Sequence, residues 1–311
     1  MPKLAIVIPC YNEEAVIEHS FKVLCEKLEN LISKKLIDKD SFLCFVDDGS
    51  RDKTCEILLH LKKQKHAIVK LSKNYGHQNA LLAGLEFVQD KCDCVVSMDC
   101  DLQDDINAID AMLEQFKNGA ELVYGVRKAR DKDTMFKKTT ALAFYRFMHF
   151  MGVKIIYNHA DYRLLSSRAC KALLEFKEVN LFLRGIVPLI GYKSEVVYYE
   201  RGSRFAGTSK YTLSKMLSFA LNGITSFSIM PLRIMSFVGV ILFLLSIIFG
   251  FYALYMKIFT QEPISGWTST ILVLLFFGGM QFIGLGIIGE YIGKIYTEVK
   301  HRPRYFVEAI L

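Results

Sequence analysis

Short apolar runs and longer amphipathic runs alternate along the first hundred residues of the chain. The apolar runs have the length of buried strands. The runs between them place hydrophobic residues three and four positions apart, which is the spacing of one helix face. The predicted strands are 4–8, 42–46, 68–71 and 94–98, and the predicted helices are 13–33, 53–63 and 77–89. This alternation predicts an α/β domain with a Rossmann-like, mostly parallel sheet that is covered by helices on both faces.

Two uncharged apolar windows lie near the end of the chain, at residues 234–256 and 267–289. Each holds 23 residues, enough for a helix to cross the roughly 30 Å of a bilayer's hydrocarbon core. The loop between them carries one Lys and one Glu, whereas four basic residues follow the second window: Lys294, Lys300, Arg302 and Arg304. By the positive-inside rule we expect two transmembrane helices in the inner (plasma) membrane, with both ends of the chain in the cytoplasm.

An amphipathic stretch at residues 209–226 precedes the first window. Its apolar residues, among them Leu213, Leu217 and Leu221, recur at helical spacing beside Lys210 and Lys215. This pattern favours an interfacial helix lying on the membrane. A helix packed on the preceding domain would show the same spacing, so both interpretations stay open. The predicted divisions are a cytoplasmic α/β domain at 1–208, an interfacial helix at 209–230, and a membrane domain with a basic cytoplasmic tail at 231–311.

Glycines recur every seven residues in the second window and just after it, at Gly279, Gly286 and Gly293. Small residues on one side of a transmembrane helix let another helix approach closely. We therefore expect close packing along this side, either within the hairpin or between chains, which leaves a homo-oligomer open.

The net charge of +7 over 311 residues is unevenly distributed. Residues 1–126 carry 15 Lys and Arg against 21 Asp and Glu, whereas residues 127–215 carry 18 against 7. An acidic first part suits a cation, and a basic second part suits phosphates or an anionic membrane surface, although solvated helix faces are the alternative. No nucleic-acid partner is expected.

All eight cysteines lie before residue 171, without a CxxC pair. This usage predicts small buried hydrophobic side chains in a reducing compartment rather than a disulfide framework or a zinc site. The N-terminal apolar run is only five residues long and stops at Pro9, so it does not read as a signal peptide.

Polar residues follow three of the predicted strands, at Pro9–Glu14, Asp47–Ser50 and Asp99–Asp104. Because the carboxyl ends of parallel strands lie at one edge of a sheet, we expect the three clusters to meet in one crevice. Asp47–Ser50 alone could be a turn or a helix cap. Asp99 and Asp101 supply hard oxygen ligands that can hold Mg²⁺ or Mn²⁺ and leave positions for substrate phosphates.

Together these motifs resemble family 2 glycosyltransferases of the GT-A fold. More closely they resemble the polyprenyl-phosphate glycosyltransferases, which include GtrB-like bactoprenol glucosyltransferases and dolichyl-phosphate mannose synthase. The resemblance covers the whole chain, with two C-terminal spans, and its motifs are Pro9–Glu13, Asp47–Ser50, Asn74–Gly76, Asp99–Asp104, Asp161–Ser166, Arg201–Tyr211, Gly289–Lys294 and Arg302–Arg304. One departure is that the family continues its acidic motif into a Pro-Pro-Glu turn, whereas this chain reads Asp104-Asp105-Ile106-Asn107.

The resemblance implies a role for individual residues. The nucleotide pocket would be lined by Pro9, Tyr11, Glu13, Val46 and Asp48, with backbone from Cys100. The metal would be held by Asp99, Asp101 and Gln103. The phosphates of donor and acceptor would be faced by Arg127, Arg201, Arg204 and Lys210. Asp161 would lie next to the sugar, although it could instead be a structural acid that pairs with Arg163 or a nearby arginine. Likewise, Arg127 could belong to a solvated basic loop.

The implied reaction transfers a sugar from a UDP-sugar to undecaprenyl (polyprenyl) phosphate, with inversion at the anomeric centre. The implied donor is UDP-glucose or a related UDP-hexose, and the product serves the modification of a cell-envelope glycan. A processive polysaccharide synthase of the same fold is an alternative. It is disfavoured because Trp267, the only tryptophan, is not in a Gln-x-x-Arg-Trp motif, and because two spans cannot enclose a channel. A catalytically silent partner of a lipid flippase is the other alternative, and the intact Asp99 and Asp101 argue against it. His77 and His159 have no metal-ligand spacing around them, so neither is expected to be catalytic.

Overall fold

The computed structural model describes residues 1–61, 66–128, 159–179, 181–200, 202, 225, 228–259 and 266–311. These residues fall into two compact units. The sheet unit contains the described residues up to 202 together with 301–311, and the hairpin unit contains residues 225 and 228–300. The interfacial helix predicted at 209–230 lies outside the described residues, apart from 225 and 228–230.

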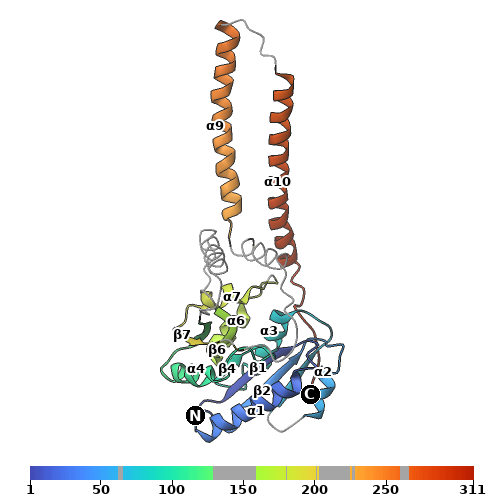
Figure 1. The fold of residues 1–311 in the computed structure, drawn as a ribbon, viewed down its shortest axis with the longest axis vertical. Coiled ribbons are helices and arrows are strands. Elements are labelled where there is room, and N and C mark those ends of the chain that lie inside the picture. Colours follow the sequence, from blue (N-terminus) through green and yellow to red (C-terminus); the bar gives the residue numbers. More distant parts are fainter. Residues whose placement is uncertain are drawn as a thin grey trace. The chain divides into compact units, whose positions relative to one another are not determined.

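The described residues of the sheet unit form eight strands in the order β7-β5-β6-β4-β1-β2-β3-β8. Figure 1 labels β7, β6, β4, β1 and β2 among them. Neighbours β4, β1, β2 and β3 run parallel, as do β5 and β7, while β6 and β8 pair antiparallel with their neighbours. The predicted mostly parallel α/β sheet is therefore confirmed. The strands are β1 (Leu4–Cys10), β2 (Phe42–Asp47), β3 (His66–Leu71), β4 (Cys94–Ser97), β5 (Leu122–Arg127), β6 (His159–Ser166), β7 (Ser194–Tyr199) and β8 (Val307–Ile310).

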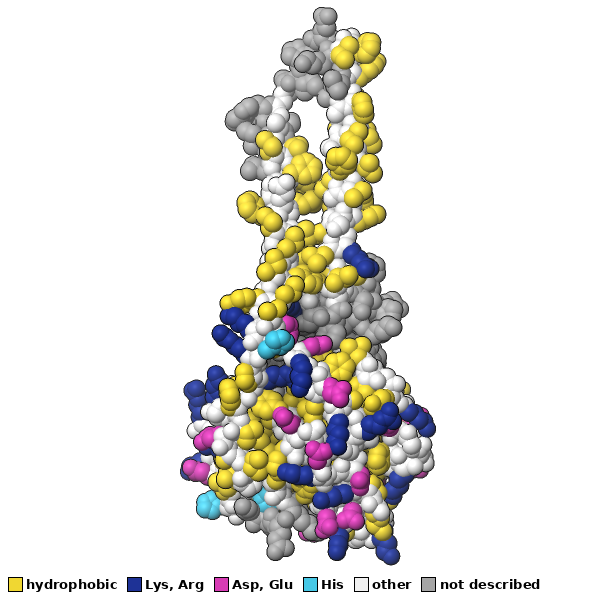
Figure 2. Space-filling model, turned by 180° about the vertical axis from the view of Figure 1, so that it is seen from behind, with side chains coloured by type: hydrophobic (Ala, Val, Ile, Leu, Met, Phe, Trp, Pro, Cys, Tyr) yellow, Lys and Arg dark blue, Asp and Glu magenta, His cyan; other side chains and the backbone are white. Residues whose placement is uncertain are grey.

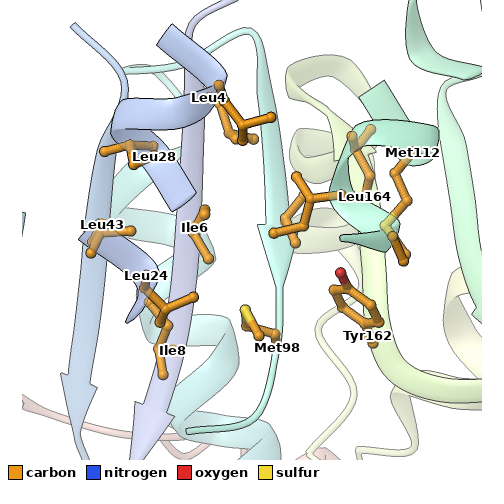
Figure 3. Close-up of a cluster of buried hydrophobic side chains, with 14 of the residues drawn as sticks. Leu4, Ile6, Ile8, Leu24, Leu28, Leu43, Met98, Met112, Tyr162 and Leu164 are labelled. Carbon is orange, nitrogen blue, oxygen red and sulfur yellow. The ribbon is translucent and has the colours of Figure 1, made fainter. Parts of the chain in front are cut away.

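Helices cover both faces of this sheet. Side chains of α1 and α4 share one hydrophobic core with alternate residues of β1, among them Leu4 and Ile6 (Figure 3). On the other face, α3 packs so tightly that a Cβ added to Gly84 would come within 2.4 Å of Val7 Cγ1 and 2.7 Å of Val46 Cγ2. The helices are α1 (Ile17–Ser33), α2 (Thr54–His60), α3 (His77–Val88), α4 (Ala108–Lys117), α6 (Ser167–Glu175) and α7 (Leu183–Ile186), the last continued by the 3-10 turn Val187–Ile190.

The cysteines have the environment that the sequence predicts. Six of the eight are buried, and all eight are free thiols. They pack as small apolar side chains, which is the common environment of unpaired cysteine.

The last residues of the chain return to the sheet. β8 pairs antiparallel with β3, with Ile310 opposite Val69, and the amides and carbonyls of Leu311 and Ile68 bond each other at 2.9 and 3.0 Å. Lys70 and Glu308 add an ion pair at 3.1 Å. The sequence predicts that all of 231–311 belongs to the membrane domain. In the structure, residues 301–311 belong to the sheet unit instead. They do so because β8 covers an edge of the sheet that would otherwise be open.

The hairpin unit consists of two long helices, α9 (Met230–Phe259) and α10 (Trp267–Val299). Within the described residues, one stretch is long and apolar enough to cross a membrane, Met230–Tyr252, with a mean hydropathy of 2.7 and none of it buried. Figure 2 shows hydrophobic side chains along both helices. The first predicted span lies within α9. The second lies within α10, and this helix continues for ten residues beyond the end of the predicted span. A second membrane crossing stays a prediction.

Among the residues that the structure describes, the predicted glycine packing is not found within the hairpin. A Cβ added at Gly279, Gly286 or Gly293 would meet nothing within 4 Å, whereas one at Gly284 would meet the Met235 side chain. The spacing therefore does not serve contact between α9 and α10. Its use between chains stays a prediction.

Deleting Val307–Leu311 is expected to lower the melting temperature of the full-length protein in detergent by several degrees or more, because β3 loses its backbone partners on one side. Glu308→Ala is the control: it removes only an exposed ion pair, worth about 0–1 kcal/mol, and should change the melting temperature little. A deletion as stable as the wild type would show that β8 adds nothing to the sheet.

Candidate functional site

The loops after β1 and β2 are bound to each other, so the first two polar clusters do meet. The Asn12 amide donates to Ser50 Oγ at 3.1 Å, and the Glu13 amide donates to Thr54 Oγ1 at 2.9 Å. The Asp48 amide donates to the Cys10 carbonyl at 2.9 Å. Parallel pairing in register brings this about, since it aligns the carboxyl ends of neighbouring strands.

Residues predicted to line the nucleotide pocket lie on these strand ends. Pro9 and Val46 are opposite each other in the pairing of β1 with β2. Val46 is fully buried, whereas the Tyr11 ring is 38% exposed and open to a ligand. Cys100 is buried, and its carbonyl accepts a hydrogen bond of 2.6 Å from Ser20 Oγ.

Asp48 holds the loop between β3 and α3. Its two carboxylate oxygens accept the Tyr75 amide at 2.7 Å and the Gly76 amide at 2.9 Å. Burial raises the pKa of Asp48 above its ordinary value, and the two amides partly offset that rise. Gly76 adopts φ +88°, a conformation that favours glycine, which explains the glycine of the Asn74–Gly76 motif. Asp48 thus fixes the loop that leads into α3.

The acidic motif Asp99–Asp104 follows β4. Asp101 Oδ1 accepts the Gln103 amide at 3.2 Å, in a turn where Leu102 has φ +51°. Loss of hydration raises the pKa of Asp99, and the carboxylates of Asp161, Asp104 and Asp101 add to the rise while His77 opposes it. The motif therefore concentrates negative charge that a cation would relieve.

The donor set of this motif fits a divalent metal ion. Asp99 and Asp101 are partly exposed carboxylates, and Gln103 adds an amide oxygen. Hard oxygen ligands of this kind suit Mg²⁺ or Mn²⁺, which keep positions for phosphate oxygens and water. Among the described residues, no three His, Cys, Asp or Glu side chains gather around one point.

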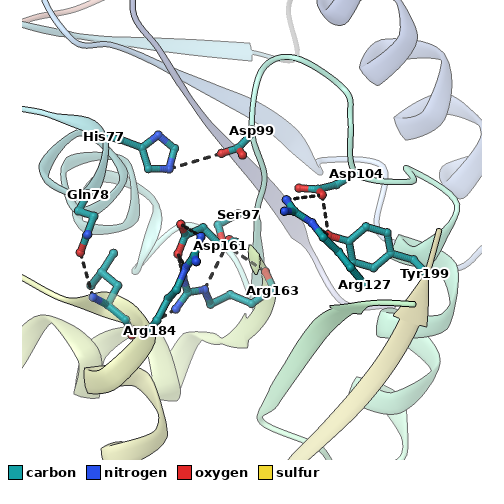
Figure 4. A network of polar contacts seen from close by, with 11 residues as sticks. His77, Gln78, Ser97, Asp99, Asp104, Arg127, Asp161, Arg163, Arg184 and Tyr199 are labelled. Carbon is teal, nitrogen blue, oxygen red and sulfur yellow. Dashed lines mark hydrogen bonds and ion pairs between the residues drawn. The ribbon is translucent and has the colours of Figure 1, made fainter. Parts of the chain in front are cut away.

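Asp161, on β6, lies between two arginines (Figure 4). Arg163 Nη2 is 2.5 Å from Asp161 Oδ1, and Arg184 Nη2 is 3.1 Å from Oδ2. Burial alone would raise the pKa of Asp161, but Arg184 and Arg163 outweigh it and hold the pKa well below its usual range. The pairing with Arg163 is thus confirmed, and Asp161 is a firmly ionised carboxylate.

Arg127, at the end of β5, contacts Asp104 and Tyr199 (Figure 4). Its Nη2 is 3.0 Å from Asp104 Oδ1, and its Nε donates to the Tyr199 hydroxyl at 3.1 Å. The Tyr199 hydroxyl in turn donates to Asp104 Oδ1 at 2.5 Å. Burial raises the pKa of Tyr199, and the neighbouring Asp104 carboxylate raises it further, so the hydroxyl stays protonated. Arg127 is therefore part of a hydrogen-bonded ring rather than of a solvated loop.

The remaining predicted phosphate ligands, Arg201, Arg204 and Lys210, lie outside the described residues. Their neighbour Gly202 is described, and its amide donates to the Gln103 carbonyl at 2.8 Å. The chain at Gly202 therefore lies against the acidic motif.

The site also contains residues that the sequence did not single out. His77 Nε2 is 3.4 Å from Asp99 Oδ1, so His77 lies beside a predicted metal ligand, and its lack of a catalytic role stays a prediction. Its position directly after Asn74–Gly76, at the start of α3, was the available signal. Arg184 is brought in by α7, whose first residue, Leu183, donates its amide to Gln78 Oε1 at 2.9 Å. No motif marked Arg184.

Comparison with known proteins gives two family matches. Residues 5–174 match glycosyl transferase family 2, and residues 230–295 match the GtrB C-terminal hairpin. The glycosyltransferase YkoT of Bacillus subtilis strain 168 is 50% identical over 309 residues, 99% of this chain and 91% of YkoT. The bactoprenol glucosyl transferase of Shigella phage SfV is 36% identical over 309 residues, 98% of each protein.

Solved structures of similar fold include glucosyl-3-phosphoglycerate synthase from Mycobacterium tuberculosis, in complex with Mn²⁺, UDP and glucosyl-3-phosphoglycerate. It has a TM-score of 0.44 and 16% sequence identity, and the alignment covers 72% of this chain and 78% of that one. The family match spans more than half of the chain, and relatives of 36–50% identity span nearly all of it. The protein therefore belongs to glycosyltransferase family 2 and is a glycosyltransferase of the GT-A fold.

Proposed function

We propose that this glycosyltransferase transfers a hexose from a UDP-sugar, UDP-glucose or a close relative, to polyprenyl phosphate, and that undecaprenyl phosphate is the acceptor. The observation that carries the proposal is the combination, in one chain, of a family 2 site with a match to the GtrB C-terminal hairpin. Relatives named bactoprenol glucosyl transferase, 35–36% identical over almost the full length, support this acceptor. The exposed apolar stretch Met230–Tyr252 suits an enzyme that meets its acceptor at a membrane.

The donor would lie across the ends of β1, β2 and β4. Tyr11 would contact the nucleoside, with Pro9, Glu13, Val46 and Cys100 around it, while Asp48 would keep the β3–α3 loop in place. Asp99, Asp101 and Gln103 would hold Mg²⁺ or Mn²⁺. When bound, such a cation offsets the negative charge that grows on the departing diphosphate.

The acceptor phosphate needs positioning more than it needs a base. A phosphate monoester has a second pKa of about 6 and is mostly a dianion at neutral pH, so its oxygen is already nucleophilic. The ion-paired Asp161, whose pKa is lowered, would be a weak proton acceptor, which fits a reaction that needs none. In-line attack by the phosphate oxygen would invert the anomeric centre.

Guanidinium and ammonium groups would offset the repulsion between the acceptor and the donor diphosphate. Arg127 lies beside the acidic motif in the structure. Arg201, Arg204 and Lys210 are proposed for the same task from the sequence, and the hydrogen bond from the Gly202 amide to the Gln103 carbonyl supports this. Arg184, one-third exposed beside Asp161, is a further candidate.

The membrane arrangement is part of the proposal. We propose that α9 and α10 both cross the inner membrane, and that the catalytic domain and both chain ends face the cytoplasm, where nucleotide sugars are made.

The proposed reaction is tested by incubating membranes that contain the protein with undecaprenyl phosphate and a panel of radiolabelled nucleotide sugars. The label in the lipid extract is then measured. Label in the extract from none of the donors, with an active reference enzyme in parallel, would contradict the proposal.

Asp101→Ala is expected to lower turnover by about a hundredfold or more, because a direct carboxylate ligand is lost and the diphosphate charge is left unscreened. Binding of Mn²⁺ in the presence of UDP, followed by electron paramagnetic resonance, should weaken in parallel. The control is Asp90→Ala, which removes an exposed carboxylate that pairs with Lys171. Full activity of Asp101→Ala after treatment with EDTA would disprove the metal assignment.

Arg204→Ala is expected to reduce transfer efficiency toward polyprenyl phosphate by roughly ten- to a hundredfold, because a hydrogen bond to a charged group is worth about 1.5–3 kcal/mol. UDP affinity, measured by calorimetry, should change much less if Arg204 serves the acceptor alone. Arg168→Ala, which removes an exposed arginine paired with Glu121, is the matched control. An Arg204→Ala protein that loses UDP binding in step with activity would assign the residue to the donor instead.

A further inference from the structure

The turn at Gln103–Asp105, where the acidic motif ends, is held in place by residues that lie far from it in the sequence. Three consecutive residues of this turn each accept a hydrogen bond from a residue on β6, on β7 or just after β7. The bonds are from the Gly202 amide to the Gln103 carbonyl at 2.8 Å, from the Tyr199 hydroxyl to Asp104 Oδ1 at 2.5 Å, and from the Tyr162 hydroxyl to the Asp105 carbonyl at 3.0 Å. The position of this turn therefore depends on contacts that lie far from it in the sequence.

The local sequence of this turn offers little restraint of its own. A proline would fix its φ angle, but Asp104–Asn107 contains none, and Leu102, two positions earlier, adopts a left-handed conformation. The tyrosine hydroxyls and the buried Asp104 supply a restraint that the local sequence lacks.

The geometry around Asp104 also fixes Arg127. Two nitrogens of the guanidinium, Nε and Nη2, are held by the Tyr199 hydroxyl and by Asp104 Oδ1. Because the guanidinium is planar, two such bonds set the orientation of the whole group. Asp104 and Tyr199 are each 3% exposed, whereas the Arg127 side chain is 24% exposed. The buried side chains of Asp104 and Tyr199 thus orient the Arg127 guanidinium, which reaches solvent beside the acidic motif.

We propose that Tyr199 is a positioning residue for the donor diphosphate. Its hydroxyl accepts from Arg127 Nε and donates to Asp104 Oδ1, and in this way it sets the orientation of Arg127. The inference rests on the proposed function, since it assumes a nucleoside diphosphate at this motif.

A variant that lacks only the Tyr199 hydroxyl should show whether this residue acts on donor binding or on the stability of the fold. In Tyr199→Phe the ring can keep its edge contact with Tyr162, whose centroid is 5.2 Å away, so the core stays filled. Asp104 keeps its ion pair with Arg127, but the guanidinium loses the partner of its Nε atom. We therefore expect weaker donor binding with little loss of stability.

The test compares full-length wild type, Tyr199→Phe and Tyr198→Phe in detergent. Tyr198 directly precedes Tyr199 on β7 and is 64% exposed. Its replacement by Phe therefore controls for the loss of a tyrosine hydroxyl from this strand. Calorimetry measures UDP affinity in the presence of Mn²⁺, electron paramagnetic resonance measures bound Mn²⁺, and steady-state kinetics separate the KM of the donor from kcat. Tyr199→Phe should weaken UDP binding by roughly five- to fiftyfold, as expected for a bond in a charged network, and should raise the donor KM. Tyr198→Phe should match the wild type.

A double variant tests whether Tyr199 acts through Arg127. In an Arg127→Ala background, Tyr199→Phe should have little further effect on UDP affinity, because the group that it orients is gone. Additive losses would overturn the proposal, as would a Tyr199→Phe protein with wild-type UDP affinity and only a lowered melting temperature. If Tyr199→Phe does not fold, Asp104→Asn, which keeps the shape of the carboxyl, must show the same loss of UDP affinity. A wild type that binds neither UDP nor GDP with Mn²⁺ would contradict the proposed function, and the role of Tyr199 with it.

Discussion

Crowding of carboxylates at one edge of the sheet is the constraint on which the site depends. The ends of β2, β4 and β6 bring Asp47, Asp48, Asp99, Asp104 and Asp161 to the same edge, and most of them are buried. A buried charge is costly unless other groups compensate it. Asp48 is stabilised by backbone amides, Asp104 by Arg127 and Tyr199, and Asp161 by two arginines. Asp47 accepts the Ser50 amide, Asp99 faces His77, and Asp101 accepts the Gln103 amide. Asp99 and Asp101 are the more open of these carboxylates, and a cation beside them would further offset their charge.

This division of partners also separates the tasks of the carboxylates. Those with strong internal partners organise the protein, because each ties together segments that are distant in sequence. Asp161 joins β6 to α7, and Asp104 joins the acidic motif to β5 and β7. The internal ion pairs and hydrogen bonds thus hold the geometry of this edge of the sheet.

The elements visible in the sequence are those with local patterns. The strands β1 to β4 and the helices between them follow from apolar runs and helical spacing, and the acidic clusters at their ends follow from parallel topology. Tyr199 and Arg184 could not be found in this way, since Tyr199 meets Asp104 across 95 residues and Arg184 meets Asp161 across 23. Pair contacts of that kind depend on how β6 and β7 join the sheet, which no periodicity encodes. β8 was missed because four residues after a long helix are too few to show alternation.

The return of the chain to the sheet limits how it can be threaded through a bilayer. β3 precedes the hairpin and β8 follows it, and the two strands are hydrogen-bonded in one sheet. The points where the chain leaves and rejoins this domain must therefore lie on the same side of the membrane, so the number of crossings between them is even. A hairpin that crosses twice satisfies this parity, whereas a single pass does not. Pairing of β8 must also wait until the hairpin has been synthesised, which makes it a late step in the folding of the sheet.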